Sequence, residues 1–255
     1  MLQERHFHIS KIEPQVISQT FTPFLPKAES LPDQLVPDLL TRFSTKEGYS
    51  IYPDVLPFFE KLRSIKNTAS SQSQAKNPWP WSQTIVGIIT NSDDRIPGIL
   101  QSFGLSVGPR RVGTPDERSA EARIQDDVSF VVLSYDIGAE KPDQKIFDAA
   151  KRMLEETLAG NSSDESAQRA DEFEMLFVGD DLKKDVLGAR EAGWHGVLLD
   201  REERYEDRFN DGEHLVTIDA SPEDKNETCS GGAVQVIKDL RALEEWRPSD
   251  GSEAS

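Results

Sequence analysis

The chain has 255 residues, 36% of them hydrophobic, which suffices for one large domain with polar insertions around its own core. Acidic residues outnumber basic ones by 46 to 29, and the formal charge of −17 argues against nucleic acid or an anionic membrane surface as a partner. A single cysteine, Cys229, excludes an internal disulfide framework. The sequence has no apolar run long enough to span a membrane, so we expect a soluble protein in the cytoplasm, with the nucleus as a second location.

Short apolar runs alternate along the chain with segments of helical periodicity. Helices are predicted where apolar residues recur at helical spacing, in residues 36–43, 55–65, 96–103, 146–154, 182–189 and 236–243. Strands are predicted where apolar, mostly β-branched runs are too short for a helix, in residues 84–90, 130–133, 175–178, 196–199 and 215–218. Pro53 stands where the second helix can begin, Ser92 or Asp93 can cap the third, and Gly193 suits the end of the fifth. The alternation predicts an α/β fold with a doubly wound parallel sheet covered on both faces.

Four segments are rich in Ser, Asn, Gly, Pro and charged residues, and we expect them to be flexible. They are residues 67–82, 160–172, 221–232 and 247–255.

Polar side chains follow three of the predicted strands, at the edge of the sheet where ligands of such folds bind. Thr90 and Asn91 follow the first of these strands, Lys141 lies in the loop after the second, and Asp180 follows the third with Asp185 one helical turn further on. Taken singly, each has an ordinary interpretation: Thr-Asn as a helix cap, Lys before Pro as a solvated loop charge, and Gly-Asp-Asp as a strand-to-helix turn. Their order along the chain is what indicates an active site.

The ordered set resembles the haloacid dehalogenase superfamily, the aspartyl-nucleophile phosphatases and dehalogenases. Thr90 matches that superfamily's second motif, Lys141 its third, and Asp180 with its preceding glycine and with Asp185 its fourth. The surrounding stretches ITNSDDRIPGILQSFGL, GAEKPDQKIFDAA and FVGDDLKKDVLGAREAGW are similar to the dehalogenase-like hydrolase branch, and most of all to the haloacid dehalogenase-like hydrolase domain-containing protein 3 group. The resemblance covers roughly residues 12–243.

The resemblance implies a Mg²⁺-dependent phosphatase of small phosphorylated metabolites and a role for each residue. The Thr90 hydroxyl and the Asn91 backbone N–H, at a helix N-terminus, would bind phosphoryl oxygens. Lys141 would add a point charge that steadies both the nucleophile and the phosphate. Asp180 and Asp185 would hold Mg²⁺, which prefers a few carboxylates together with waters and substrate oxygens.

The superfamily's first motif, a hydrophobic strand ending in Asp-x-Asp that supplies the nucleophile and the general acid, has no counterpart in this sequence. The first aspartate, Asp33, follows no apolar strand, and residues 12–24 are similar instead to part of the family's helical cap. Asp219 and Asp200 each follow an apolar run but lack the second Asp, so neither is expected to replace the nucleophile. The 255 residues are therefore predicted to be inactive or nearly so. The alternative is a non-catalytic pseudo-hydrolase that binds phosphate or a protein partner.

The missing motif also bears on the fold, because its strand is the central one of the family's sheet, between the strands of the second and fourth motifs. Without it, two rows of backbone donors and acceptors face each other unpaired, and each buried unpaired group costs about 1–3 kcal/mol. The chain must then re-pair, borrow a strand from a partner or another copy, or be marginally stable.

The predicted organisation follows from these features. Residues 1–50 are a remnant of a helical cap, residues 51–246 an α/β core with polar inserts at 67–82 and 160–172, and residues 247–255 a disordered tail. The expected partners are a small phosphorylated substrate if the protein is active, and a second copy or a strand-donating partner.

Weaker signals have ordinary interpretations. Asp181 is interpreted as a solvated residue at a helix end rather than a metal ligand. His6 and His8 share one side of a strand but have no third ligand nearby. Trp79 and Trp81, in a polar insert, are expected to pack against the edge of the domain rather than to anchor a partner.

Overall fold

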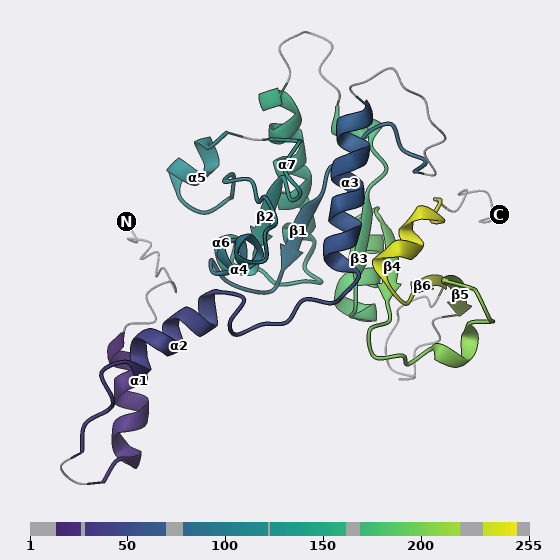
Figure 1. Cartoon of the computed structure of the whole chain (residues 1–255). Coiled ribbons are helices and arrows are strands. Elements are labelled where there is room, and N and C mark those ends of the chain that lie inside the picture. Colours follow the sequence, from purple (N-terminus) through teal and green to yellow (C-terminus); the bar gives the residue numbers. More distant parts are fainter. Residues whose placement is uncertain are drawn as a thin grey trace.

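The computed structural model describes residues 14–26, 29–69, 79–121, 123–161, 169–219 and 232–248, and its strands form two sheets (Figure 1). The sheet orders are β1-β2 and β3-β4-β6-β5. The strands are β1 (Gly87–Thr90), β2 (Phe130–Leu133), β3 (Leu176–Gly179), β4 (His195–Leu199), β5 (Leu215–Asp219) and β6 (Ala233–Ile237). The helices are α1 (Pro14–Phe21), α2 (Leu35–Ser44), α3 (Val55–Ala69), α4 (Ile96–Ser102), α5 (Pro115–Ser119), α6 (Ser134–Ile137), α7 (Gln144–Asn161) and α8 (Gly188–Glu191). The predicted α/β class is confirmed.

Most of the strand pairing is parallel, as predicted. β1 pairs with β2, β3 with β4, and β4 with β6 in parallel, whereas β5 pairs with β6 antiparallel. The expectation of a wholly parallel sheet is therefore wrong at this edge. An antiparallel edge strand on an otherwise parallel sheet is common in doubly wound folds.

The two sheets are separate. β1, which ends at Thr90, and β3, which directly precedes Asp180, belong to different sheets with no hydrogen bond between them. A cavity of about 540 Å³ lies between the two strands.

Two apolar layers cover the faces of the strands, because successive side chains point to opposite faces. In β2, Val131 and Leu133 join the cluster under α3, while Phe130 and Val132 join the cluster under α7. The α7 layer is completed by a stripe with the predicted helical spacing, whose fully buried members are Ile146, Phe147, Ala149 and Ala150. Both faces of the strands are thus buried, as the apolar runs predicted.

The helix predicted over residues 236–243 is wrong in its first part. Residues 233–237 form β6, and only residues 240–244 form a short 3-10 helix, η6 (Leu240–Glu244). The run Ala-Val-Gln-Val-Ile is rich in β-branched side chains, which fit the pleated sheet better than a helix. Because β6 lies between β4 and β5, Val234 and Val236 are completely buried. Tertiary packing decides the conformation of this segment.

Two predicted helices begin where expected, at Ile96 and Leu182, but differ from the prediction in their cap or their type. α4 begins at Ile96, and its N-cap is Arg95 without a side-chain hydrogen bond, so neither Ser92 nor Asp93 caps it. Asp93 instead accepts hydrogen bonds from the Arg95 guanidinium, at 2.7 and 2.8 Å. The segment after β3 begins as a π-helix, η4 (Leu182–Leu187), and continues as α8. Gly193 follows α8 with φ +79°, the left-handed conformation expected for it.

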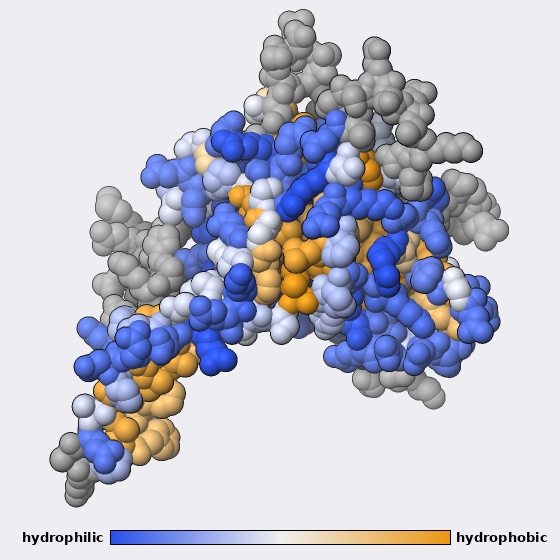
Figure 2. Space-filling view, in the orientation of Figure 1, coloured by the Kyte–Doolittle hydropathy of each residue, from blue (hydrophilic) through white to orange (hydrophobic). Residues whose placement is uncertain are grey.

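Large apolar side chains are exposed at one end of the molecule (Figure 2). α1 and α2 form a helical pair that projects from the core, and it carries most of this surface. The exposed residues are Val16, Phe21, Phe24, Phe43, Tyr49 and Tyr52. All of them except Tyr52 lie in residues 1–50, the part of the chain that was predicted to be a cap remnant.

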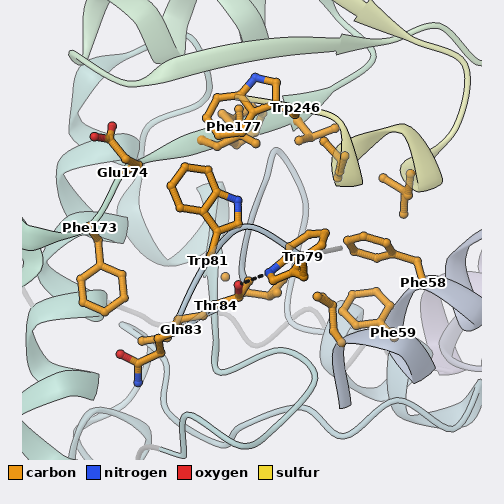
Figure 3. A pocket seen from close by; sticks show the side chains of 18 of the residues that line it. Phe58, Phe59, Trp79, Trp81, Gln83, Thr84, Phe173, Glu174, Phe177 and Trp246 are labelled. Carbon is orange, nitrogen blue, oxygen red and sulfur yellow. Dashed lines mark hydrogen bonds between the residues drawn. The ribbon is translucent and has the colours of Figure 1, made fainter. Parts of the chain in front are cut away.

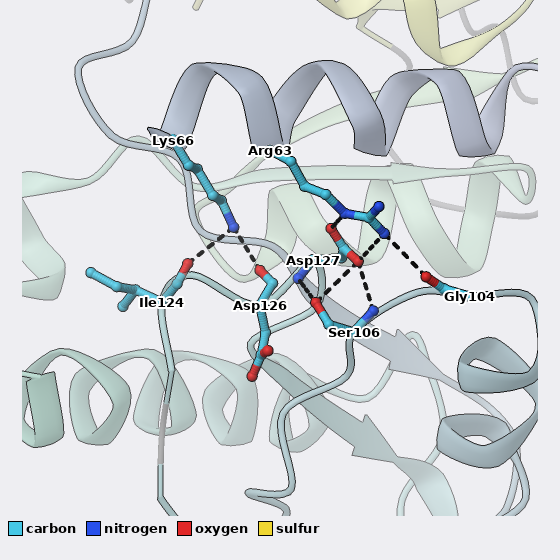
Figure 4. A network of polar contacts seen from close by, with 7 residues as sticks. All are labelled: Arg63, Lys66, Gly104, Ser106, Ile124, Asp126 and Asp127. Carbon is cyan, nitrogen blue, oxygen red and sulfur yellow. Dashed lines mark hydrogen bonds and ion pairs between the residues drawn. The ribbon is translucent and has the colours of Figure 1, made fainter. Parts of the chain in front are cut away.

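An ion-pair network joins α3 to the loops before β2 (Figure 4). Arg63 on α3 donates from two nitrogens to the buried carboxylate of Asp127, which also accepts from the backbone and hydroxyl of Ser106. Lys66, one turn further along α3, donates to the carbonyls of Ile124 and Asp126 at 3.0 and 2.7 Å. The network attaches α3 to the sheet edge that it covers.

The segments predicted to be flexible lie partly outside the described residues. α3 extends into the first of them, to Ala69, and Trp79 and Trp81 at its far end contact neighbouring side chains. Trp79 is buried and its indole N–H donates to the Thr84 hydroxyl at 2.8 Å, and Trp81 stacks against Trp246 at 5.8 Å. His6, His8 and Cys229 belong to the part of the chain that the structure does not describe.

Candidate functional site

The predicted site residues lie at the carboxyl ends of β1, β2 and β3. Thr90 is the last residue of β1, Lys141 follows α6 in the loop after β2, and Asp180 comes directly after β3. Contacts between the segments that follow these strands show that the three carboxyl ends meet at one edge, as expected for parallel strands.

Asn91 clamps the backbone of Lys141. Its side-chain oxygen accepts from the Lys141 backbone N–H at 2.7 Å, and its amide nitrogen donates to the Lys141 carbonyl at 3.2 Å. The two residues are 50 positions apart, so this pair of hydrogen bonds fixes the Lys141 loop to the end of β1. The predicted placement of the Asn91 N–H at a helix N-terminus is wrong, because α4 begins five residues later, at Ile96.

Lys141 and Asp185 form a largely buried ion pair. The Lys141 Nζ lies 2.6 Å from Asp185 Oδ1, and the two side chains are only 12% and 4% exposed. The ammonium also lies 5.0 Å from the centre of the Phe177 ring, within the range of a cation–π interaction. The charge of Lys141 is therefore held at the strand ends by a carboxylate and an aromatic face.

Gly179 makes room for this ion pair. A Cβ atom at this position would lie 2.2 Å from Asp185 Oδ2, far inside normal contact. Asp185 Oδ2 also accepts from the Asp181 backbone N–H at 3.1 Å, so the carboxylate lies directly over the end of β3. The glycine of the Gly-Asp-Asp sequence is explained by this close approach.

The two aspartates after Gly179 have different environments. Asp181 is the N-cap of η4, where its side chain accepts from the backbone N–H groups of Lys183 and Lys184 at 3.0 and 2.8 Å. This confirms that Asp181 is a helix-end residue. Asp180 is exposed and lines a small cavity of about 80 Å³ at the ends of β3 and β4.

The donor set for Mg²⁺ is incomplete among the residues that the structure describes. These residues contain no group of three or more His, Cys, Asp or Glu side chains that could hold a metal ion. Asp180 suits a Mg²⁺ ligand, because its carboxylate is exposed at the strand ends. Both oxygens of Asp185 already accept hydrogen bonds, from Lys141 and Asp181. The structure thus places Asp185 as the partner of Lys141, and its role as a metal ligand stays a prediction.

The aspartates considered as substitute nucleophiles have other surroundings. Asp200 is buried and accepts from the backbone N–H groups of Arg204 and Tyr205 at 3.0 and 2.9 Å, which makes it the cap of a loop. Asp219 ends β5, the strand at the far edge of its sheet, and is exposed. Neither lines the cavity between β1 and β3.

A second buried ion pair lies beside Asp180, and sequence reasoning missed it. Arg201 donates from two nitrogens to Asp54 at 2.9 Å each, and Asp54 also accepts from the Leu240 backbone N–H at 2.8 Å. Burial raises the pKa of the Asp54 carboxyl, but the Arg201 guanidinium and the Leu240 N–H outweigh it and hold that pKa below its ordinary value. Arg201 also stacks over the Tyr52 ring at 4.3 Å. The only sequence signal was an Asp before a helix.

Comparisons with known proteins agree with the site. Residues 138–217, which contain Lys141, Asp180 and Asp185, match the family model of HAD-hydrolase-like proteins. An uncharacterized protein of Saccharomyces cerevisiae is 28% identical over 177 residues, which are 69% of this chain and 47% of that protein. A protein of Schizosaccharomyces pombe named as an uncharacterized hydrolase is 27% identical over 170 residues, 67% of this chain and 56% of its own length. The chain thus spans about half the length of these relatives.

Other similarities cover less or are weaker. The rhythmically expressed gene 2 protein of Drosophila melanogaster is 30% identical over 114 residues, 45% of this chain and 32% of that protein. A crystal structure of a HAD phosphatase from Thermococcus onnurineus matches with a TM-score of 0.40 and 20% identity, covering 78% of this chain and 61% of the other. No helix in the described part of the chain is long and apolar enough to cross a bilayer.

Proposed function

We propose that the chain is a hydrolase of the haloacid dehalogenase superfamily and carries part of the active site of a Mg²⁺-dependent phosphatase of small phosphorylated metabolites. The match of residues 138–217 to the HAD-hydrolase-like family model supports this proposal. The observation that carries this proposal is the buried Lys141–Asp185 pair, clamped by Asn91 at the end of β1. A fixed ammonium at converging strand ends is suited to stabilising the negative charge of a transferring phosphoryl group.

Each residue of the site has a proposed task in binding. Lys141 attracts the phosphoryl oxygens, and the Thr90 hydroxyl, at the last position of β1, donates to one of them. Asn91 keeps the Lys141 loop in place, and Asp180 with the substrate oxygens holds the metal. Mg²⁺, when bound, supplies charge neutralisation that the protein's own cations do not provide.

We further propose that the 255 residues by themselves do not turn over substrate. A nucleophilic carboxylate must lie within reach of the phosphorus. Among the described residues, Asp185 is bound to Lys141, and the other candidates, Asp200 and Asp219, lie at the ends of β4 and β5 and not between β1 and β3. We place the protein in the cytoplasm on its acidic composition and single cysteine.

The test has an activity arm and a binding arm. In the first, the folded chain is assayed for Mg²⁺-dependent hydrolysis of p-nitrophenyl phosphate, with Asp180→Asn as control, and we expect both to equal the blank without protein. Turnover that disappears in Asp180→Asn would show that a nucleophile is present and that the proposed inactivity is wrong.

The binding arm measures the melting temperature in orthophosphate with Mg²⁺. We expect the melting temperature to rise for the unmodified chain, to stay unchanged for Lys141→Met, and to rise normally for Lys145→Met, a matched loss of one exposed lysine on α7. Ligand that binds only the native state stabilises it by mass action. A folded chain without any response would refute the phosphate site and favour a pseudo-hydrolase that binds a protein partner.

A further inference from the structure

An apolar groove that the proposed function does not use lies between β1 and β3 (Figure 3). Both strands line it, and aromatic side chains from α3, from the segment before β1 and from the C-terminal segment surround it (Figure 3). These side chains are Phe58, Phe59, Trp79, Trp81 and Trp246. Exposed apolar surface of this kind marks an interaction site, because covering it with a partner is more favourable than leaving it in water.

The backbone groups on both sides of the groove lack partners among the described residues. The Val86 carbonyl accepts from Ser129 and therefore faces β2, and the Met175 carbonyl accepts from His195 and faces β4. Because successive residues of a strand face opposite sides, Gly87 and Ile89 in β1, and Leu176 and Val178 in β3, direct their N–H and C=O groups into the groove. The groove thus has two facing rows of hydrogen-bonding groups, as an edge strand does.

The size of the groove matches one short strand. A residue in a sheet occupies about 3.3 Å along the strand, about 4.8 Å between strands and about 10 Å between layers, or about 160 Å³. A cavity of about 540 Å³ therefore holds three to four residues. β1 and β3 each have four residues, so one strand of this length would pair along both.

The side chains on either face specify the chemistry of that strand. On one face it would meet Leu62 and Trp79 of the α3 cluster, and on the other Ile89 and Phe177 of the α7 cluster. Since both faces are apolar, every residue of the strand should be apolar, as in strands buried on both sides.

The remainder of this chain does not contain such a segment. Outside the described residues the sequence has no three consecutive apolar residues, and the described apolar runs already belong to helices, strands or the core. A second copy of the chain has the same composition and offers nothing different.

We propose that the groove between β1 and β3 binds one extended, wholly apolar polypeptide strand from outside these 255 residues, joining the two sheets in the order β2-β1-strand-β3-β4-β6-β5. Binding by strand addition uses backbone hydrogen bonds for affinity and alternate side-chain pockets for specificity. This inference does not depend on the proposed phosphatase activity, because the experiment below measures binding of a strand to the groove and not hydrolysis.

The probe is an acetylated, amidated synthetic peptide, Lys-Lys-Val-Ile-Val-Ile-Val-Gly-Lys, and its matched control has proline in place of the central valine. Three of the four tryptophans line the groove, so we expect the probe to change tryptophan emission in a saturable way, and the proline peptide to bind at least tenfold more weakly. Amide exchange at Gly87, Ile89, Leu176 and Val178 should slow at least tenfold with the probe and stay unchanged with the control.

A pair of protein variants tests the pairing itself. Leu176 is the first residue of β3 and its N–H faces the groove, so Leu176→Pro removes a donor to the docked strand and leaves the β3–β4 ladder intact. We expect it to weaken the probe at least tenfold relative to Leu176→Ala. Three outcomes would each overturn the proposal. The first is equal binding of the two peptides, and the second is protection from amide exchange that is confined to α1 and α2. The third is a free protein that is dimeric and whose groove amides are already protected from exchange.

Discussion

The tightest contact at the site predicts a large effect of one methyl group. In Gly179→Ala, the added Cβ would lie 2.2 Å from Asp185 Oδ2, 2.5 Å from Cγ and 2.6 Å from Cβ. Normal contacts of this kind exceed about 3.0 Å, so the carboxylate must move by about 1 Å. The Lys141 Nζ–Oδ1 distance of 2.6 Å would then approach 3.6 Å, which is no longer a hydrogen bond.

The cost has two parts. Overpacking a filled site costs about 1–3 kcal/mol, and losing a hydrogen bond between charged groups costs about 1.5–3 kcal/mol. Some relief comes from movement of the carboxylate, so we expect Gly179→Ala to lower the free energy of unfolding by about 2–4 kcal/mol. Lys141 would also lose its fixed position, and the response to orthophosphate with Mg²⁺ should disappear.

The assay is unfolding in urea, with Gly98→Ala as the matched control. Gly98 lies in α4, and a Cβ there meets nothing closer than 3.9 Å, so this variant should be neutral or slightly stabilising. A double-mutant cycle with Asp185→Gly isolates the cause, because the clash requires the Asp185 side chain, whose Cβ would still lie 2.6 Å from the added methyl group in Asp185→Ala. If the cost of Gly179→Ala is the same with and without that side chain, the clash with Asp185 is refuted as its cause.

Further variants address the clamp, the α3 network and a helix end. Asn91→Ala removes both hydrogen bonds to the Lys141 backbone and should cost about 1–3 kcal/mol in urea unfolding while weakening the orthophosphate response; an unchanged response would mean that the loop holds itself in place. The melting temperature should fall as the pH is lowered through about 4, because the Asp127 carboxyl then becomes protonated. Burial raises the pKa of this carboxyl, but Arg63 and the neighbouring donors outweigh burial. The pKa of Asp127 in the folded protein therefore lies below the unfolded value of about 3.9. A group of this kind stabilises the protein above that pH and loses its contribution as the pH falls, so Asp127→Asn should flatten the acid side of the profile, and a profile identical to the unmodified chain would contradict this assignment. Gly193→Ala places a Cβ in open space at φ +79°. We expect the free energy of unfolding, measured by calorimetry, to fall by about 1–2 kcal/mol from backbone strain alone.

Local patterns in the sequence sufficed for most of the fold. β2 was predicted at its observed bounds, and the stripe of α7 and the left-handed Gly193 follow from periodicity and backbone chemistry. β6 was missed because its apolar residues also fit helical spacing, whereas its β-branched side chains and its position between β4 and β5 favour a strand. Local preference was insufficient there because burial on both sides decided the outcome.

Contacts across long stretches of sequence were beyond local reasoning. Asn91 was assigned to phosphoryl binding through its backbone N–H at a helix N-terminus, whereas its side chain is bound to Lys141, 50 positions away. Asp54 and Arg201 are 147 positions apart, and nothing near either residue indicates the other. The order of motifs along the chain located the site, but the pairing of charges within it required the structure.

That pairing changes how the charge of the site should be understood. Lys141 and Asp185 neutralise each other at 2.6 Å, so the ammonium is already partly compensated before any phosphate arrives. Asp180 adds a further negative charge at the same strand ends, on a chain whose formal charge is −17. Orthophosphate alone would therefore meet a site without net positive charge, and a divalent cation on Asp180 reverses that balance. We accordingly expect the melting temperature to rise only when Mg²⁺ and orthophosphate are added together; an equal rise with orthophosphate alone would mean that Lys141 binds the anion without the metal.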